Sequence, residues 1–287
     1  METDPLFEPF SWSHGAAPAL IGLSGWQYSN WKGKFYPAGL AAKDQLGYVA
    51  RTFPTLELNS TFYRLSRPST YEKWAGQAPD GFVFAVKGWR QITQYKRLKD
   101  VAEPLAMFFR SGPVGLGKKL GPILWQLPPS LAFDEDVLSD FFALLPKTLG
   151  DAETFIRTHA PDDGVEPPIV LGEDAGQPIR YALEPRNETF RDPAVAPLLR
   201  EFGVAMVMAD SAGRHPEFDE VTADFAYARL HGSPKIYYSD YSAPVLEQWA
   251  ERIEGWRDRG IGSYVYFDNT ALGYAPKNAL DLMRMVS

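Results

Sequence analysis

Short apolar runs that end in polar side chains recur along the chain. They are rich in β-branched and aromatic residues, a composition typical of buried strands. Eight such runs occur, at residues 19–24, 55–59, 82–87, 122–126, 180–184, 204–210, 225–231 and 263–268. Because each run is short and bounded by polar or turn-forming residues, the pattern predicts eight strands.

The segments between these runs show helical spacing. In residues 134–145, apolar side chains recur at Val137, Leu138, Phe141 and Phe142, which places them on one face of a helix. Proline lies near the first turn of three other segments, where it suits a helix start. The further predicted helices are 41–52, 67–78, 193–202 and 244–259.

Strands that alternate with helices predict a parallel sheet, and eight such units predict that the sheet closes. We therefore expect one α/β domain over residues 1–287, a single (β/α)8 TIM barrel with an N-terminal extension at 1–18. A doubly wound open sheet is the alternative. It usually carries a glycine-rich phosphate loop after its first strand, and the sequence from Gly22 to Trp26 lacks that fingerprint.

Residues 150–178 interrupt the rhythm before the fifth predicted strand. The segment is rich in Pro, Gly, Asp and Glu, so we interpret it as an insertion that leaves the barrel as an exposed excursion. Residues 154–159 and the apolar residues 168–171 suggest a small hairpin within it.

Composition narrows the class of protein. Hydrophobic residues make up 45% of the 287 residues, enough for a large core, and the absence of cysteine excludes disulfides and thiolate metal sites. The acidic residues near Met1 do not form a signal peptide, and no apolar stretch is long enough to span a membrane. We therefore expect a cytoplasmic protein without a membrane partner. The net charge of −7 disfavours non-specific nucleic-acid binding over the whole surface.

Several motifs occur in a fixed order. They are Gly25-Trp26-Gln27-Tyr28 with Trp31, Gly33 and Phe35-Tyr36-Pro37; Glu57-Leu58-Asn59-Ser60-Thr61-Phe62-Tyr63-Arg64; Lys87-Gly88-Trp89-Arg90-Gln91-Ile92-Thr93; Leu124-Trp125-Gln126-Leu127-Pro128-Pro129; Arg229-Leu230-His231-Gly232; and Phe267-Asp268-Asn269. Together they resemble the YecE-like family, also called domain of unknown function family 72. The resemblance spans about residues 21–279. It implies a TIM barrel and no established reaction.

The chain departs from the pattern of that family at three places. Gln94 stands where the family commonly has histidine, and the fifth-strand motif contains Asn187 where the family usually has histidine. The last strand ends in Asp268-Asn269 where the family often has two asparagines. The loss of two imidazoles argues against histidine-dependent metal or acid–base chemistry.

In a TIM barrel the carboxyl ends of the strands converge on one mouth, where active sites lie. Polar residues at the ends of the predicted strands are therefore the candidate site. The catalytic candidates are Glu57, Lys87, Glu184 and His231, and the substrate-binding candidates are Trp26, Tyr28, Asn59, Arg90, Gln126, Arg186, Asp210, Arg229, Asp268 and Asn269.

The cations among these residues indicate a small anionic ligand or a phosphate group. We expect an enzyme, such as a hydrolase or lyase, that acts on a phosphorylated or nucleotide-like substrate. Glu57 or Glu184 would be the general base and His231 the proton donor or orienting group, or Lys87 would form a Schiff base. The structural alternative is that the charges pair inside the barrel, as Glu57 with Lys87 or Glu184 with Arg229.

Other functions stay open. Residues 87–99 combine basic side chains with Trp89 and Tyr95, which favours a nucleic-acid-binding module without catalysis. A glycosidase would need Glu57 and Glu184 as its carboxylate pair. No cofactor is expected: four histidines are too few for a multi-zinc site, although oxygen ligands would suit Mg²⁺ or Mn²⁺. An inert, ion-paired scaffold is the fourth hypothesis.

Overall fold

The strands close into one parallel ring. The computed structural model describes residues 17–163 and 172–287. The strands are β1 Ala19–Ser24, β2 Thr55–Leu58, β3 Val83–Lys87, β4 Leu120–Gln126, β5 Tyr181–Glu184, β6 Val204–Asp210, β7 Phe225–Leu230 and β8 Gly262–Phe267. Each pairs with the next in chain order, and β8 returns to β1, where Ala19 lies opposite Ser263. The predicted (β/α)8 barrel is confirmed, and every predicted strand ends within two residues of an observed one.

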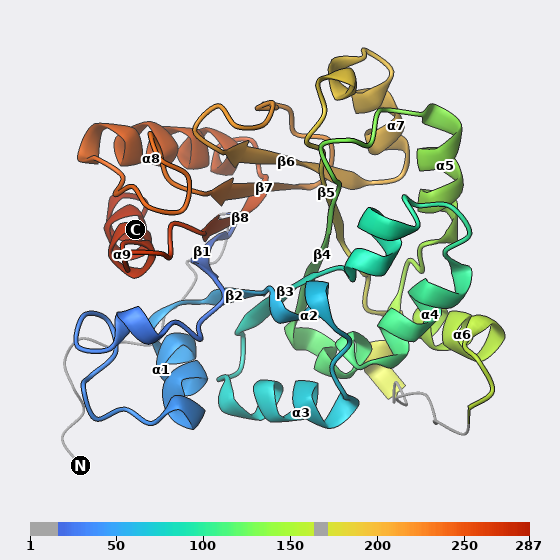
Figure 1. Ribbon diagram of the computed structural model, residues 1–287, viewed down its shortest axis with the longest axis horizontal. Helices are drawn as coiled ribbons and strands as arrows, with labels where there is room; N and C mark the ends of the chain where they lie inside the picture. Colours follow the sequence, from blue (N-terminus) through green and yellow to red (C-terminus); the bar gives the residue numbers. More distant parts are fainter. Residues whose placement is uncertain (1–16, 164–171) are drawn as a thin grey trace.

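Helices surround the ring (Figure 1). They are α1 Gln45–Thr52, α2 Ser60–Tyr63, α3 Pro68–Gln77, α4 Ala102–Arg110, α5 Glu135–Leu144, α6 Leu149–His159, α7 Val195–Glu201, α8 Ala243–Arg257 and α9 Ala275–Met285. Five of them match the predicted helices, whereas α2, α4, α6 and α9 do not follow from the sequence analysis. The short helical turns are η1 Ser29–Trp31, η2 Ala42–Asp44, η3 Gln91–Tyr95, η4 Pro113–Lys119, η5 Gly172–Gly176 and η6 Glu188–Arg191, of which η3 is π-helical.

Alternation along the strands separates two apolar cores. Side chains of one parity point into the ring, and those of the other point out toward the helices. The inner core contains Leu20, Ala85, Leu124, Ala182, Ala205, Val207, Ala209, Phe225, Tyr227, Tyr264 and Tyr266. The larger outer core includes Leu23, Trp125 and Phe267, buried beneath the helices. Because strand polarity is shared, the inward positions at the carboxyl ends form one further layer, and that layer is polar.

The prediction of an exposed excursion with a hairpin is wrong for the first part of residues 150–178. Residues 149–159 form α6, which Thr148 and Asp151 start with a capping box. Leu149, Ala152 and Ile156 lie on one face of α6 and are buried. The helix therefore belongs to the outer layer of the barrel. Residues 168–171 lie outside the described residues.

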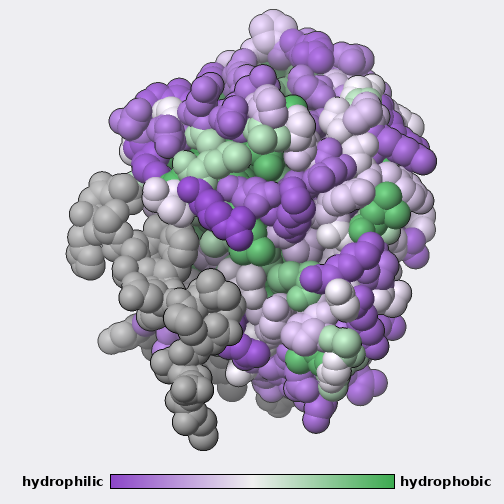
Figure 2. Space-filling model, turned by 90° about the vertical axis from the view of Figure 1, so that its left-hand side faces the viewer, coloured by the Kyte–Doolittle hydropathy of each residue, from purple (hydrophilic) through white to green (hydrophobic). Residues whose placement is uncertain are grey.

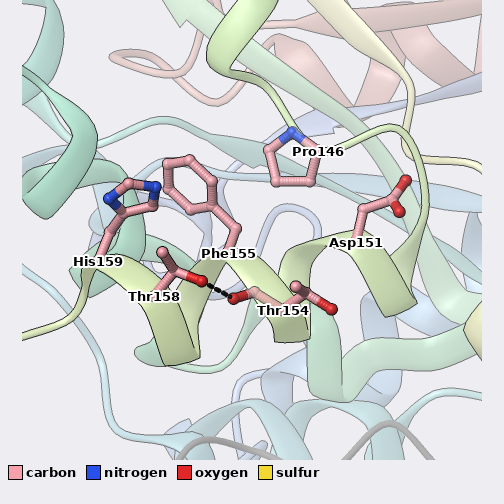
Figure 3. Close-up of a pocket in the computed structure, with 6 residues that line it drawn as sticks. All are labelled: Pro146, Asp151, Thr154, Phe155, Thr158 and His159. Atoms are coloured by element: carbon pink, nitrogen blue, oxygen red, sulfur yellow. Dashed lines mark hydrogen bonds between the residues drawn. The ribbon is translucent and has the colours of Figure 1, made fainter.

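A shallow hollow of about 330 Å³ lies along the outside of α6. Figure 3 shows its lining, with Asp151, Phe155 and His159 projecting from successive turns of the helix and Pro146 beside them. The Thr158 hydroxyl donates to the Thr154 carbonyl at 2.9 Å, a bond internal to the helix. None of these residues is a candidate from the strand ends, so the hollow is separate from the mouth.

Hydrophilic residues cover most of the face shown in Figure 2, and apolar residues form small separate patches there. In residues 17–163 and 172–287, no helix has the length and apolar character needed to cross a membrane.

Candidate functional site

The polar layer at the carboxyl end of the ring follows from strand parity. Ser24, Glu57, Lys87, Gln126 and Glu184 each come two residues after an inward position that is small or apolar. All five are buried, and Glu57 has no exposed surface at all. Placing ionised groups at such depth is unfavourable unless each is paired, so their hydrogen-bond partners define the site.

Arg229 on β7 lies at the centre of this layer. Its Nε and Nη2 donate to the two carboxylate oxygens of Glu57 at 3.0 and 2.7 Å, and its Nη1 donates to Glu184 Oε2 at 2.8 Å. The remaining N–H groups face His231 Nε2 at 3.3 Å and Ser24 Oγ at 3.2 Å. Burial alone would lower the pKa of Arg229, but Glu57 and Glu184 raise it well above its ordinary value. The guanidinium has no donor left for a ligand.

Glu57 accepts two further hydrogen bonds besides those from Arg229. The hydroxyl of Ser24 donates to Oε1, and the hydroxyl of Tyr227 donates to Oε2 at 2.7 Å. Ser24 in turn accepts a hydrogen bond from Asn59 Nδ2 at 2.6 Å. Glu57 pairs with Arg229 and not with Lys87, so that predicted pair is wrong, whereas the predicted pair of Glu184 and Arg229 is present at 2.8 Å.

Glu184 connects the centre of the network to its rim. Its Oε1 accepts from Arg186 Nε at 2.7 Å. Burial by itself would raise the pKa of Glu184, but Arg186 and Arg229 hold it well below its ordinary value. Arg186, with 13% of its side chain exposed, also donates through Nη2 to Gln126 Oε1 at 2.8 Å. Glu184 therefore fixes the orientation of a cation that reaches solvent.

Lys87 is the second cation, after Arg186, that donates to the amide oxygen of Gln126. Its Nζ donates to Gln126 Oε1 at 2.8 Å and lies 4.5 Å from the centre of the Phe62 ring. Within the described part of the chain, no carboxylate approaches Nζ within 4.0 Å. Burial, followed by the charge of Arg229, lowers the pKa of Lys87 to about 8. The amine of Lys87 therefore titrates closer to neutral pH than an ordinary lysine does.

His231 and Asp268 form a hydrogen-bonded pair beside Arg229. The two contact through Nδ1 and Oδ2 at 2.9 Å. Because Nε2 faces a guanidinium N–H, which can only donate, the imidazole accepts at Nε2 and donates from Nδ1. Burial would raise the pKa of Asp268, but the hydrogen bond from His231 and the charge of Arg229 lower it. Both nitrogens of His231 are occupied, which suits an orienting group better than a proton donor.

Other candidate residues lie around this network. The Tyr28 hydroxyl donates to the Ser24 carbonyl at 2.8 Å, and Trp26 is buried edge-on against Trp74. Asp210 accepts from the Tyr241 hydroxyl at 2.8 Å. Asn269 is turned away toward the Ser239 carbonyl and Asn278. The structure thus brings together most of the candidates, but Asn269 supports a loop and does not face the others.

Three residues of the site, Ser24, Tyr227 and Gln94, were absent from the candidate set. Tyr227 could have been found from its spacing, since it precedes Arg229 by two positions on the same face of β7. Gln94 donates to the Gln126 carbonyl at 2.8 Å from the π-helical turn η3. No periodicity signals a π-helical turn, so Gln94 could be named only by the family comparison.

The described residues contain no group of three or more His, Asp or Glu side chains placed to hold a metal ion. The carboxylates at the mouth face cations and hydroxyl donors instead.

A closed parallel ring with helices outside and a polar layer at its carboxyl end defines a TIM-barrel protein. The chain belongs to the DUF72 family, described as a protein of unknown function, whose profile matches residues 20–287.

Relatives of known sequence or structure agree with this assignment. The chain is 30% identical to UPF0759 protein YunF of Bacillus subtilis (strain 168), over 93% of this chain and 94% of that one. A crystal structure of a DUF72 family protein from Thermotoga maritima MSB8 is similar with a TM-score of 0.74, at 24% identity over 94% of this chain and 99% of that one. A DUF72 family protein from Enterococcus faecalis V583 gives a TM-score of 0.71, at 17% identity over 93% and 95% of the chains.

Proposed function

We propose that this protein is an enzyme that acts on a small phosphorylated substrate at the carboxyl-end mouth of the barrel. The observation that supports it is the convergence of Lys87 and Arg186 on one neutral oxygen, Gln126 Oε1, at 2.8 Å each. Two cations that share one uncharged acceptor repel each other, and a multivalent oxyanion would relieve that repulsion. Arg186 offers the planar geometry and Lys87 the point charge that phosphate binding commonly uses.

The roles follow from the titration of each group. Lys87, with a pKa of about 8, would donate a proton to the departing oxygen at neutral pH. Asp268, kept ionised by His231 and Arg229, would orient the attacking hydroxyl or water. Glu57 and Glu184 would act as positioning residues, because their oxygens are already occupied by Arg229.

A Schiff-base mechanism is the second candidate, and the lowered pKa of Lys87 favours it. A neutral amine would attack a substrate carbonyl and release its oxygen as water to form an imine. Borohydride would reduce that imine and leave a stable mass increase on Lys87. An unlabelled Lys87 after trapping with phosphorylated aldehydes and ketones would remove this mechanism and keep the hydrolytic one.

A glycosidase is not favoured by the geometry. Glu57 and Glu184 share one guanidinium and are buried at 0% and 1% exposure. A glycosidase also needs one carboxylic acid that stays protonated, and Arg186 and Arg229 lower the pKa of Glu184 instead.

Thermal unfolding in the presence of anions tests the proposal. Inorganic phosphate and sugar phosphates should raise the midpoint relative to chloride at matched ionic strength, by about 2.7 kcal/mol of stability at a hundredfold excess over Kd. Arg186→Lys and Lys87→Met should reduce that shift. Arg200→Lys, at an exposed pair with Glu220, is the matched control and should respond as wild type does. An equal response from all variants would contradict the proposal.

A further inference from the structure

Two exposed tyrosines stand next to the mouth. Tyr63 at the end of α2 is 61% exposed, and Tyr95 at the end of η3 is 62% exposed. They are the two most exposed large hydrophobic side chains in residues 17–163 and 172–287. Single exposed aromatic side chains are ordinary on protein surfaces, so the significance of these two depends on the charges around them.

Arg90 lies between these two rings. Its guanidinium carbon is 5.6 Å from the centre of the Tyr63 ring and 5.5 Å from the centre of the Tyr95 ring. The ion pairs found among the described residues do not include Arg90, in contrast to Arg186 and Arg229. We call Tyr63, Arg90 and Tyr95 the rim surface. It presents two aromatic faces and one cation with no acidic partner.

The charge around the rim surface is strongly positive. The segments 59–68 and 87–99, which carry it, contain seven Lys and Arg residues and no Asp or Glu: Arg64, Arg67, Lys87, Arg90, Lys96, Arg97 and Lys99. The protein as a whole has a net charge of −7. Cations concentrated in this way on an acidic protein indicate a polyanionic partner at this place.

The rim surface is continuous with the mouth. The Tyr63 ring lies 5.1 Å from the Phe62 ring, and the Phe62 ring lies 4.5 Å from Lys87 Nζ. On the other side, η3 carries both Tyr95 and Gln94, and Gln94 donates to the Gln126 carbonyl. The side chains of the rim surface therefore adjoin those that surround Lys87.

The backbone beneath Tyr95 is held in an uncommon conformation. η3 is a π-helical turn, and Arg97 and Leu98 follow it with φ of 53° and 68°. Arg97 anchors this segment by donating to the Ser130 carbonyl at 2.6 Å. π-helical turns and left-handed non-glycine residues are unfavourable and concentrate at functional sites.

We infer that the rim surface binds single-stranded nucleic acid. One base would stack on Tyr63 or Tyr95, Arg90 would contact the adjacent phosphate, and the strand would continue toward Lys87 and Arg186. Stacking on an aromatic ring is open to unpaired bases, whereas the bases of a duplex are already stacked. An uncharged glycan would make no use of the seven cations. The inference rests on the proposed function only for the phosphate that would lie at Lys87.

Fluorescence anisotropy with short labelled DNA and RNA single strands tests this inference. Wild type should bind with an affinity that falls steeply as salt rises. Tyr63→Ala, Tyr95→Ala and Arg90→Ala should each weaken binding, the tyrosine variants by about 5- to 150-fold. Tyr238→Ala is the matched control, since Tyr238 is also exposed, at 45%, and also lies 4.5 Å from a cation, Lys235. It should bind as wild type does.

Three outcomes would overturn the inference. They are tighter binding of duplex than of single strands, equal binding of heparin that does not depend on Tyr63 and Tyr95, and equal affinity for a mononucleotide and a strand. Lys87→Met separates the two proposals. Strand binding that survives in Lys87→Met, when phosphate does not raise the unfolding midpoint of wild type, supports the rim surface and contradicts the proposed function. A phosphate-induced shift in wild type without strand binding does the opposite.

Discussion

Two acids at the mouth have pKa values below the usual range of carboxyl groups, so they stay ionised at lower pH. This determines how the stability of the protein responds to acid. The pKa of Glu184 and that of Asp268 are lower in the folded protein than their ordinary values of 4.5 and 3.8, because cations and His231 offset the effect of burial. Their contribution to stability is therefore present above those ordinary values and is lost as pH falls toward the folded-state pKa. We expect the free energy of unfolding, measured in urea, to decrease steadily below about pH 5.

Variants at single acids check the origin of that decrease. Glu184→Gln should be less stable at neutral pH and should show a shallower loss on acidification, because one linked carboxylate is gone. Glu188→Gln, at an exposed pair with Arg191, should follow the wild-type profile. Identical acid profiles for all three proteins would place the linkage elsewhere.

Lys87 gives a second pH signature, of the same direction but at alkaline pH. Its pKa falls from 10.5 to about 8 on folding, so the folded protein releases the proton first. Stability should therefore rise as pH increases from about 8 toward 10.5. NMR of reductively ¹³C-methylated protein should show one lysine that titrates near 8 and disappears in Lys87→Met. A full set of lysines titrating near 10.5 would contradict the burial of this amine.

Arg229 should be the residue least tolerant of replacement at the mouth. Arg229→Met leaves Glu57 and Glu184 buried without their shared cation, which we expect to cost about 3–5 kcal/mol in urea unfolding at neutral pH. Arg200→Met, at an exposed pair with Glu220, should cost at most about 1 kcal/mol. Similar losses for the two variants would show that the buried pairs add little.

The sequence predicted which residues meet at the mouth better than it predicted what each one contacts. Strand ends identified Glu57, Lys87, Glu184 and Arg229 because parallel strands share one polarity. Whether a cation keeps free donors depends on which acceptors its side chain can contact across the ring. Arg229 on β7 contacts acceptors on β2 and β5, and neither strand is a neighbour of β7. These contacts across the ring depend on the diameter of the barrel and on side-chain rotamers, neither of which can be predicted from residue spacing.

Among the elements, the junction after β3 depends on a glycine. A Cβ placed on Gly88 would lie 2.2 Å from ring atoms of Trp125, which is buried on β4. Gly88→Ala should therefore destabilise the protein by about 1–3 kcal/mol, since the ring is packed and cannot move freely. Gly76 lies in α3 with no atom within 4 Å of such a Cβ. Gly76→Ala should be neutral or stabilise by up to about 1 kcal/mol, and thermal unfolding of the two variants gives the comparison.

Two of the helices that escaped prediction, α2 and α6, did so for different physical reasons. α2 has four residues, too few for a helical period to show. The capping box of Thr148 and Asp151 marks the start of α6 at Leu149. The segment that follows α6 is rich in Pro and Gly, and that composition predicts an exposed excursion for the whole region. The strands were easier because every one is an almost continuous buried run.

For the whole molecule, the contribution of residues 150–178 to stability comes mainly from the packing of α6. Its Ile156 is buried, and its Phe155 ring contacts the ring of Phe109 on α4. Replacing residues 150–177 with a short linker should therefore abolish cooperative unfolding, because the apolar face of α4 would be exposed. Ile156→Ala alone should cost about 2–5 kcal/mol, against little for the exposed Thr158→Ala. A deletion variant that unfolds as wild type does would show that α6 is dispensable.

The saturation of Arg229 has a consequence for the history of the family. Losing Arg229 would leave two buried carboxylates without their shared cation, and losing either glutamate would leave N–H groups of the guanidinium without an acceptor. We therefore expect single substitutions at these positions to be destabilising. Lineages should therefore carry Glu57, Glu184 and Arg229 together or replace them together. In an alignment of family members the three positions should therefore change together, whereas rim-surface residues such as Arg90, which is in none of the ion pairs of the described residues, should vary independently.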